Sequence, residues 1–378
     1  MQHTQTGDGN QMFSVRRDRL SEFRMRALPD LELEDGAVEL SVDRFAFTAN
    51  NVTYGVVGDA FGYWNFFPTG EDGWGCIPVW GFGTVVRSRH SAISVGERFF
   101  GYYPMANRLR VLPGKVSSSG FVDGAAHRAG MSGIYNRYAL TSADPAYTAK
   151  DEPLILLYRP LYGTAFFIDD FLAEQDFFGA EAVVFASASS KTAYSTAFLL
   201  SERRRLGARV QTIGLTSRGN WAFVKGLGVY DQVVEYEAID SLSARPAVFF
   251  DMAGSGAVTL AVHRKFGDQL AHSAIVGSTH WNEGRRGAEP LPGPAPEMFF
   301  VPTLMEKRAS ELGPQELQRR LGAAWQAFTA RVRDAGSGWL TVVEGSGMEA
   351  IERVYSAALA GGLLPQEGHI LNFGKRSG

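Results

Sequence analysis

Hydrophobic and polar positions alternate along the first part of this 378-residue chain. From Phe13 to about Asp151, short runs switch between apolar and polar residues and are interrupted by Gly, Pro, Asn and Ser. This alternation is typical of half-buried strands, and it predicts one compact β domain with strands at 37–42, 81–86 and 97–102. Residues 1–10 are polar and rich in Gly and Gln, so we expect a disordered tail there.

The pattern changes near residue 154, where continuous apolar runs begin to alternate with helical stretches. Such runs are typical of parallel strands that helices cover on both faces. Small or polar residues follow each run, as expected where a strand leads into a helix. The runs lie at 182–185, 210–215, 247–251 and 274–277. The pattern predicts an α/β fold with a doubly wound parallel sheet over residues 154–339.

The C-terminal part of the chain adds helices and one more strand. Amphipathic patterns predict helices at 315–333 and 348–359, and a short apolar run predicts a last strand at 369–373. We expect this strand to return to the first domain. Residues 340–378 would then join the β domain of residues 11–153.

The most informative segment is a strand, turn, helix and strand over residues 182–217. A helix that begins directly after a strand presents free N–H groups and the positive end of its dipole, which bind a dinucleotide pyrophosphate. The turn is Ser-Ala-Ser-Ser-Lys-Thr-Ala over 187–193, and the helix runs over 194–206. We therefore infer a dinucleotide site in which the pyrophosphate contacts are Ser187, Ser189, Ser190, Lys191 and Thr192.

This turn departs from the usual Gly-x-Gly-x-x-Gly pattern because it contains no glycine. Side-chain hydroxyls and the charge of Lys191 would have to replace close backbone contacts with the phosphates. The turn is not a P-loop, since Ser190 stands where that motif requires glycine. The alternative interpretation is a plain βαβ crossover that binds nothing.

The residues at the end of the second strand select the cofactor. An acid there would hold the 2′-hydroxyl of NAD, whereas Thr216, Ser217 and Arg218, with Asn220 nearby, suit the 2′-phosphate of NADPH. The later strand ends add further expected cofactor contacts, namely Gly254, Gly277, Thr279 and His280. His280 is also a candidate proton relay, with a hydrogen-bonded loop residue as the alternative.

Composition limits the class of protein. Hydrophobic residues make up 45% and charged residues 20% of the chain, as in soluble globular proteins. A net charge of −3 gives no reason to expect nucleic acid or an anionic membrane as partner. The single cysteine, Cys76, excludes an internal disulfide, and no apolar run approaches the roughly 20 residues of a membrane span. We expect a cytoplasmic protein that acts on a small molecule.

Four segments in order resemble the medium-chain dehydrogenase/reductase superfamily. They are Asp35–Val42, Pro78–Val86, Val95–Gly101 and the Leu-Tyr-Gly-Thr-Ala stretch at 161–165. The resemblance implies a GroES-like β domain followed by a Rossmann-type domain. It also implies that Thr164 and Asn51 hydrogen-bond the nicotinamide carboxamide. For Asn51 the alternative is a turn residue that caps its own backbone.

The departures from this superfamily concern the metal. Its zinc alcohol dehydrogenases place a Cys and the His-Glu of a Gly-His-Glu segment at zinc, and the matching positions here are Asn51, Phe82 and Gly83. These residues do not supply the N and S ligands of a tetrahedral zinc site. The chain therefore resembles the zinc-free branch, which includes quinone and enoyl reductases, and we expect no metal. Without a Lewis acid, reduction of an already activated C=C is the easier chemistry.

Such a reduction needs a proton donor beside the substrate. In enoyl reductases of this superfamily a tyrosine follows the loop that corresponds to Asn51, and Tyr63 matches its spacing, with Tyr54 as the second candidate. Both tyrosines have packing as the alternative role.

Nine aromatic residues lie between Tyr54 and Phe82. They favour a bulky, apolar substrate, with a homodimer contact as the alternative. The rival functions are a non-catalytic NADPH sensor and a lyase or isomerase on the same scaffold. A serine hydrolase is disfavoured because the chain has no Gly-x-Ser-x-Gly elbow.

Overall fold

The computed structural model describes residues 9–252, 254–276, 291–334 and 336–374. The chain forms two compact units. Unit 1 comprises Met1–Leu157 with Thr341–Gly378, and unit 2 comprises Tyr158–Leu340. The expected boundaries lay after residues 153 and 339, and the compact units divide after residues 157 and 340.

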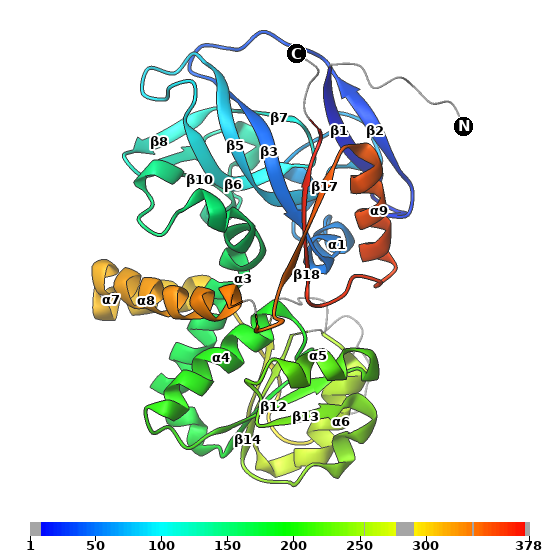
Figure 1. Ribbon diagram of the computed structural model, residues 1–378, viewed down its shortest axis with the longest axis vertical. Helices are drawn as coiled ribbons and strands as arrows, with labels where there is room; N and C mark the ends of the chain where they lie inside the picture. The colour runs from blue at the N-terminus through cyan, green and yellow to red at the C-terminus, as the bar shows by residue number, and fades with distance from the viewer. Residues whose placement is uncertain (1–8, 253, 277–290, 335, 375–378) are drawn as a thin grey trace. The chain divides into compact units, whose positions relative to one another are not determined.

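Unit 1 is built mainly of β-strands (Figure 1). Within the described residues, a small sheet has the order β2-β1-β4, from β1 (Asn10–Arg16), β2 (Phe23–Leu28) and β4 (Trp74–Gly75). A larger sheet has the order β17-β18-β3-β5-β6-β10-β9-β8, and β7 also pairs with β3. Its strands are β3 (Val38–Phe47), β5 (Pro78–Ser88), β6 (Arg98–Pro104), β7 (Arg108–Val111), β8 (Pro113–Ser117), β9 (Gly120–Asp123), β10 (Arg137–Leu140), β17 (Thr341–Ser346) and β18 (Glu367–Asn372).

The C-terminal segment completes the larger sheet. β18 runs antiparallel to β3, with His369 opposite Phe47 and Leu371 opposite Phe45, and β17 pairs with β18 in parallel. The helix between them, α9 (Met348–Leu359), has the bounds that its amphipathic pattern predicts. The short helices of unit 1 are α1 (Ala49–Val56) and α2 (Gly133–Asn136).

The aromatic segment between residues 54 and 82 is mostly core. Trp64, Phe66, Phe67 and Phe82 are buried, whereas Phe61 is 42% exposed. A Cβ atom at Gly58 or at Gly75 would collide with the Trp64 indole, so those two glycines provide the space that the ring fills. Packing therefore accounts for most of these rings, and the preference for a bulky apolar substrate stays a prediction.

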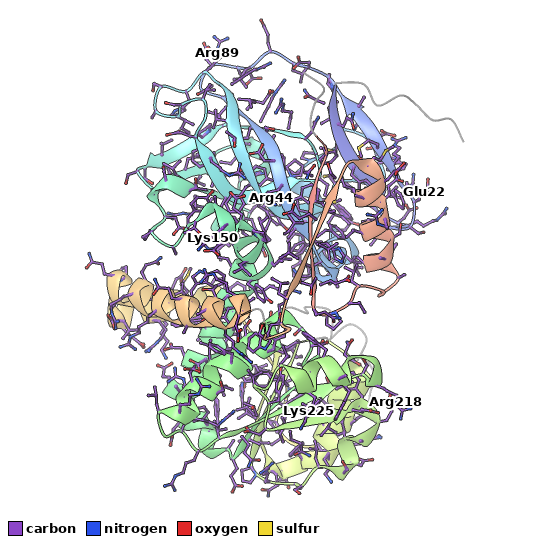
Figure 2. All side chains as sticks on the ribbon, viewed as in Figure 1. Glu22, Arg44, Arg89, Lys150, Arg218 and Lys225 are labelled. Carbon is purple, nitrogen blue, oxygen red and sulfur yellow. The ribbon has the colours of Figure 1, made fainter. Side chains whose placement is uncertain are left out.

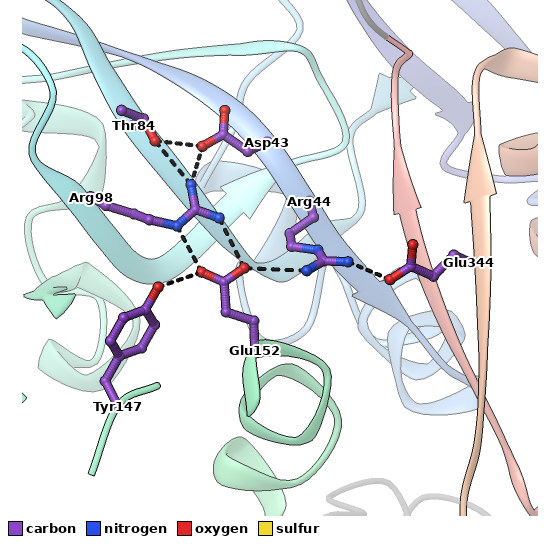
Figure 3. A network of polar contacts seen from close by, with 7 residues as sticks. All are labelled: Asp43, Arg44, Thr84, Arg98, Tyr147, Glu152 and Glu344. Carbon is purple, nitrogen blue, oxygen red and sulfur yellow. Dashed lines mark hydrogen bonds and ion pairs between the residues drawn. The ribbon is translucent and has the colours of Figure 1, made fainter. Parts of the chain in front are cut away.

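A polar network joins β3, β5 and β6 to the start of α3 (Glu152–Glu174) (Figure 3). Glu152 accepts hydrogen bonds from Arg98 Nε at 2.7 Å and from the Tyr147 hydroxyl at 2.8 Å. Arg44 bridges Glu152 and Glu344 of β17, and Arg98 also pairs with Asp43. The Glu152 side chain is only 5% exposed, so this carboxylate depends on these partners.

Unit 2 contains a six-stranded sheet within the described residues, with the order β13-β12-β11-β14-β15-β16. All its pairings are parallel. The strands are β11 (Ala182–Phe185), β12 (Gln211–Thr216), β13 (Gln232–Glu235), β14 (Ala247–Asp251), β15 (Leu270–Val276) and β16 (Glu297–Phe299). In order of appearance this is 3-2-1-4-5-6, the doubly wound arrangement of dinucleotide-binding sheets. The predicted fold class is confirmed.

Helices connect the strands of this sheet. The helices that follow α3 along the chain are α4 (Lys191–Arg205), α5 (Trp221–Gly226), α6 (Gly256–Phe266), α7 (Val301–Leu312) and α8 (Pro314–Arg333). Between β11 and β14 the chain connections leave in opposite directions, so a crevice for ligands is expected at the carboxyl ends of these strands. In the part of the chain that the structure describes, no helix has the length and apolar character to span a bilayer.

Replacing Glu152 by Gln tests the polar network. Two arginines would lose their shared buried carboxylate, so we expect the free energy of unfolding to fall by about 3 kcal/mol. Burial opposes ionisation of Glu152, but hydrogen bonds from Arg98 and Tyr147 outweigh it and hold its pKa below the usual value. The contribution is therefore present at neutral pH and is lost as the pH falls below about 4.

Denaturant unfolding at pH 7 and pH 3 measures both effects. The matched control is Glu344→Gln, because Glu344 also pairs with Arg44 but is 63% exposed. Its loss should change stability by less than about 1 kcal/mol. Equal effects of the two substitutions would contradict the assigned role of Glu152.

Candidate functional site

The turn after β11 adopts the tight conformation that glycine usually supplies. Ser187 has a φ of 52°, in the left-handed region that non-glycine residues rarely occupy. Its N–H donates to the Tyr236 hydroxyl at 3.0 Å, and its carbonyl accepts from Ser190 N–H at 2.8 Å. Tyr236 therefore stabilises a glycine-like turn in a sequence that lacks glycine.

The glycine that makes room for this turn lies on the neighbouring strand. A Cβ atom at Gly214 of β12 would lie 2.9 Å from the Ala188 Cβ. Ala188 N–H donates to Leu215 O at 3.0 Å, and the Tyr230 hydroxyl donates to Ala188 O at 2.9 Å. The close approach of turn and strand thus depends on Gly214. This glycine lies on β12 and not in the turn, so the motif pattern does not include it.

The structure brings the predicted phosphate residues together at the start of α4. Ser190 is the N-cap of this helix, and its hydroxyl accepts from Ala193 N–H at 3.3 Å. Asn220, which follows β12, donates from its amide nitrogen to the Ser189 hydroxyl at 3.1 Å. Thr192 is partly exposed on the first turn. Two strand ends therefore present hydroxyl and amide groups on one side of the helix N-terminus.

Lys191 carries a positive charge that the described part of the chain does not compensate. It is partly buried and makes no ion pair with a described residue, and its Nζ lies 5.9 Å from the centre of the Tyr158 ring. Burial lowers the pKa of Lys191 to about 8. A cation at a helix N-terminus is also opposed by the helix dipole. A bound anion would favour the charged form of Lys191 and would also interact favourably with the helix dipole.

Of the residues predicted to bind the 2′-phosphate at and after the end of β12, Arg218 is accessible to a ligand, whereas Thr216 is not. Thr216 is 1% exposed and its hydroxyl has no hydrogen-bond partner among the described residues, so burial argues against a direct cofactor contact. Arg218 lies two residues further on, in a 3-10 turn of Arg218–Asn220, and its side chain is 86% exposed (Figure 2). Its Nε donates to Glu235 Oε2 at 3.2 Å.

The later strand ends are only partly described. Gly254 has a φ of 68°, and its N–H donates to Asp251 Oδ1 at 2.9 Å. Asp251 Oδ2 accepts from the Thr259 hydroxyl at 2.8 Å, so this buried carboxylate orders the loop after β14. Three predicted cofactor residues lie outside the described residues, namely Gly277, Thr279 and His280.

Unit 1 holds a group of tyrosines that we call the tyrosine cluster: Tyr54, Tyr63, Tyr102 and Tyr135. The Tyr54 and Tyr63 rings lie 4.6 Å apart, and the Tyr63 and Tyr135 hydroxyls lie 3.3 Å apart. Asn50 donates from its amide nitrogen to the Tyr54 hydroxyl at 2.9 Å. Both predicted tyrosines therefore belong to one polar and aromatic group, whereas Tyr102 and Tyr135 were not predicted.

Burial distinguishes the two candidate donors. Tyr54 is 8% exposed, and burial raises its pKa strongly, whereas Tyr63 is only partly buried. Burial also raises the pKa of Tyr63, against an opposing hydrogen bond from Tyr135. Both hydroxyls are therefore protonated at neutral pH, and Tyr63 is the more accessible of the two.

The positions matched to the zinc ligands are engaged in packing. Asn51 accepts from Thr48 N–H at 2.9 Å and donates to Pro78 O at 3.0 Å, which satisfies its amide as a buried cap. Phe82 is fully buried, and a Cβ at Gly83 would lie 2.8 Å from Ser41 O. Within the described residues, no group of three or more His, Cys, Asp or Glu side chains is placed to hold a metal ion.

The two proposed nicotinamide contacts thus differ. The Asn51 amide is occupied within unit 1, which favours the capping alternative over a carboxamide contact. Thr164 lies in the middle of α3 and is partly buried. The sequence analysis identified Thr164 by its Thr-Ala stretch but did not predict the helix in which it lies.

Solved structures with the same fold include an NADPH complex, an oxidoreductase and a thioester reductase. CurA of Vibrio vulnificus in complex with NADPH has a TM-score of 0.60 at 13% identity, over 97% of this chain and 100% of that chain. The yhdH oxidoreductase of Salmonella enterica in complex with NADP has a TM-score of 0.53 at 13% identity, over 96% and 99%. The mitochondrial 2-enoyl thioester reductase Etr1p/Etr2p heterodimer of Candida tropicalis has a TM-score of 0.51 at 12% identity, over 96% and 99%.

At these identities the likeness shows the fold. It confirms the predicted combination of a GroES-like β unit with a Rossmann-type sheet. No curated protein matches the sequence.

A family model matches residues 45–363, and its description is "Protein of unknown function (DUF2855)". The match spans both units and most of the chain. The chain therefore belongs to the DUF2855 family.

Proposed function

We propose that the protein is an NADPH-dependent reductase that reduces an activated C=C of a bulky apolar substrate, of the enone, enoyl or quinone type, without zinc. The observation that carries the proposal is Lys191 at the start of α4, which makes no ion pair with a described residue, in a sheet with the 3-2-1-4-5-6 order. A partly buried cation with hydroxyl and amide groups beside it is suited to a pyrophosphate.

The residues present fit the cofactor. Lys191, Ser189 and Asn220 would hold the pyrophosphate, and the exposed guanidinium of Arg218 would hold the 2′-phosphate. Bound NADPH would supply a hydride. CurA and the yhdH oxidoreductase share the fold, and their structures contain NADPH and NADP.

The proposed chemistry of the chain's own residues is protonation. When a conjugated C=C is reduced, negative charge develops on the substrate oxygen and a proton must reach carbon or oxygen. Tyr63 is the proposed donor, because its hydroxyl is protonated and less buried than that of Tyr54. Tyr135 lies within hydrogen-bond distance of Tyr63 and would orient it.

Zinc independence is supported by the residues at the matched positions. Asn51 is satisfied by backbone groups, Phe82 is packed against Phe100, and Gly83 has no side chain. None of these residues offers a nitrogen or sulfur ligand that is free to bind zinc.

Tyr63→Phe tests the proposed activity. The wild-type protein should oxidise NADPH steadily in the presence of an enone or quinone, and Tyr63→Phe should lower kcat by about 100-fold because the proton donor is lost. Since burial raises the pKa of Tyr63, this donor should stay protonated to a higher pH than an ordinary tyrosine does. Tyr54→Phe, which removes a more buried hydroxyl, should have a smaller effect.

The kinetics also separate the rival functions. Binding of NADPH without its oxidation by any enone or quinone would support a sensor. Turnover of a substrate without binding of NADPH would support a lyase or isomerase.

Arg218→Ala tests the 2′-phosphate contact. Loss of a charge-assisted hydrogen bond worth about 1.5–3 kcal/mol should weaken NADPH binding roughly ten- to a hundredfold. NADH lacks the 2′-phosphate, so its dissociation constant should change by less than about twofold. Fluorescence titration of both cofactors measures this, and equal losses would contradict the assignment.

Lys191→Met tests the phosphate turn, because it should stabilise the free protein and weaken cofactor binding. A lysine with a pKa of about 8 in the folded state, against about 10.4 when unfolded, destabilises the fold below pH 8. This penalty decreases as the pH rises from 8 to 10.5. The substitution should therefore raise the free energy of unfolding of the free protein by about 1–3 kcal/mol at pH 7.

The same substitution should weaken NADPH and NADH alike, because both carry the pyrophosphate. Lys225→Met is the matched control, since Lys225 is exposed on the neighbouring helix α5. Unchanged affinity of Lys191→Met for both cofactors would mean that the turn is only structural.

A further inference from the structure

β12, the strand before Arg218, does not end in an acidic residue, but an acidic residue from another strand lies beside Arg218. Glu235 is the last residue of β13 and lies opposite Thr216, the last residue of β12. Its carboxylate accepts from Arg218 Nε at 3.2 Å. The parallel register of two neighbouring strands thus places a carboxylate and a guanidinium at the same strand ends, seventeen residues apart in the chain.

The pair leaves part of Arg218 free for a ligand. Only Nε bonds Glu235, and the two terminal nitrogens of Arg218 make no hydrogen bond with a described residue. The Arg218 side chain is 86% exposed and that of Glu235 is 29% exposed. Trp221, at the start of α5, donates from Nε1 to Val233 O at 3.4 Å, which keeps the two strand ends together.

We propose that Glu235 is a second specificity determinant of the adenosine ribose site, so that the site accepts NADH as well as NADPH. Its carboxylate accepts hydrogen bonds from the ribose hydroxyls and opposes the 2′-phosphate that Arg218 attracts. This inference rests on the proposed function, because it assumes that a dinucleotide binds at these strand ends.

Glu235 has two opposite effects on the affinity for NADPH, and the net effect depends on which is larger. By pairing with Arg218, Glu235 holds the guanidinium in place, but an ion pair of such exposure contributes little. A 2′-phosphate carries up to two negative charges, and the carboxylate of Glu235 lies on the same guanidinium that would bind it. Repulsion therefore outweighs positioning, and Glu235 limits the preference for NADPH.

Glu235→Gln is the substitution that tests this. It removes the charge and keeps a hydrogen-bonding side chain of the same size. NADPH should bind about three- to tenfold more tightly than to the wild-type protein at low salt, because like charges no longer meet. NADH should bind equally or more weakly, since an amide oxygen is a weaker acceptor for ribose hydroxyls than a carboxylate.

The control is Glu237→Gln, which removes the same charge two residues away on an exposed position. The dissociation constants of NADPH and NADH are measured for the wild-type protein and both variants at 20 mM and 300 mM salt. The ratio of NADH to NADPH dissociation constants should rise in Glu235→Gln alone, and the rise should shrink at the higher salt concentration because exposed charges are screened.

Three outcomes would overturn the inference. In the first, Glu235→Gln weakens NADPH as Arg218→Ala does, which would make Glu235 only a support for Arg218. In the second, the ratio does not change, or Glu237→Gln changes it equally. In the third, the wild-type protein binds neither dinucleotide, and this result alone would also remove the proposed function.

Discussion

The contact between the turn after β11 and Gly214 of β12 determines the candidate cofactor site. Because Gly214 has no side chain, Ala188 packs directly on the strand, and the turn closes with Ser187 in a left-handed conformation. The start of α4 then lies at the end of β11, with Ser189 bonded to Asn220 of the next loop. A side chain at position 214 would displace Ala188 or Tyr230 and with them the turn before α4.

Unit 1 depends on a different kind of constraint. Its larger sheet is completed by strands from opposite ends of the chain, and Arg44 of β3 pairs with Glu344 of β17 as well as with Glu152 of α3. Glu152 is the first residue of α3, so the network that holds Arg98 also ties down the start of this helix. Burial makes such a network sensitive to the loss of one member, because the remaining charge is left without a partner.

Local patterns in the sequence were sufficient to predict the architecture but not its contacts. The buried strands β11, β12, β14 and β15 and helix α9 follow from apolar periodicity, which each segment carries by itself. β13 and β17 were missed, because β13 is short and β17 is largely exposed, so that neither has a continuous apolar run.

The same limit applies to the site. The hydroxyls, Lys191 and Asn220 lie next to one another because they follow adjacent strands, which the sequence predicted. Glu235 and Gly214 were not predicted, since their proximity to the site depends on strand register and on packing across strands. Asn51 and Thr216 have suitable chemistry, but their burial is a property of the folded chain.

Two positively charged side chains at the strand ends of unit 2, Lys191 and Arg218, are not arranged as they would be if they served only the stability of the fold. In unit 1 the buried carboxylate of Glu152 pairs with two arginines, whereas Lys191 is partly buried, lies beside the Tyr158 ring and makes no ion pair with a described residue. A protein selected only for folding would replace such a lysine by an apolar residue, since burial of an unpaired ammonium is unfavourable. Arg218 is likewise held by one nitrogen only, with most of its surface exposed. Under the proposed function, two negative groups of one dinucleotide would pair with these cations, the pyrophosphate with Lys191 and the 2′-phosphate with Arg218. The stability that Lys191 is expected to cost would thus be explained by the anion that we propose for this site.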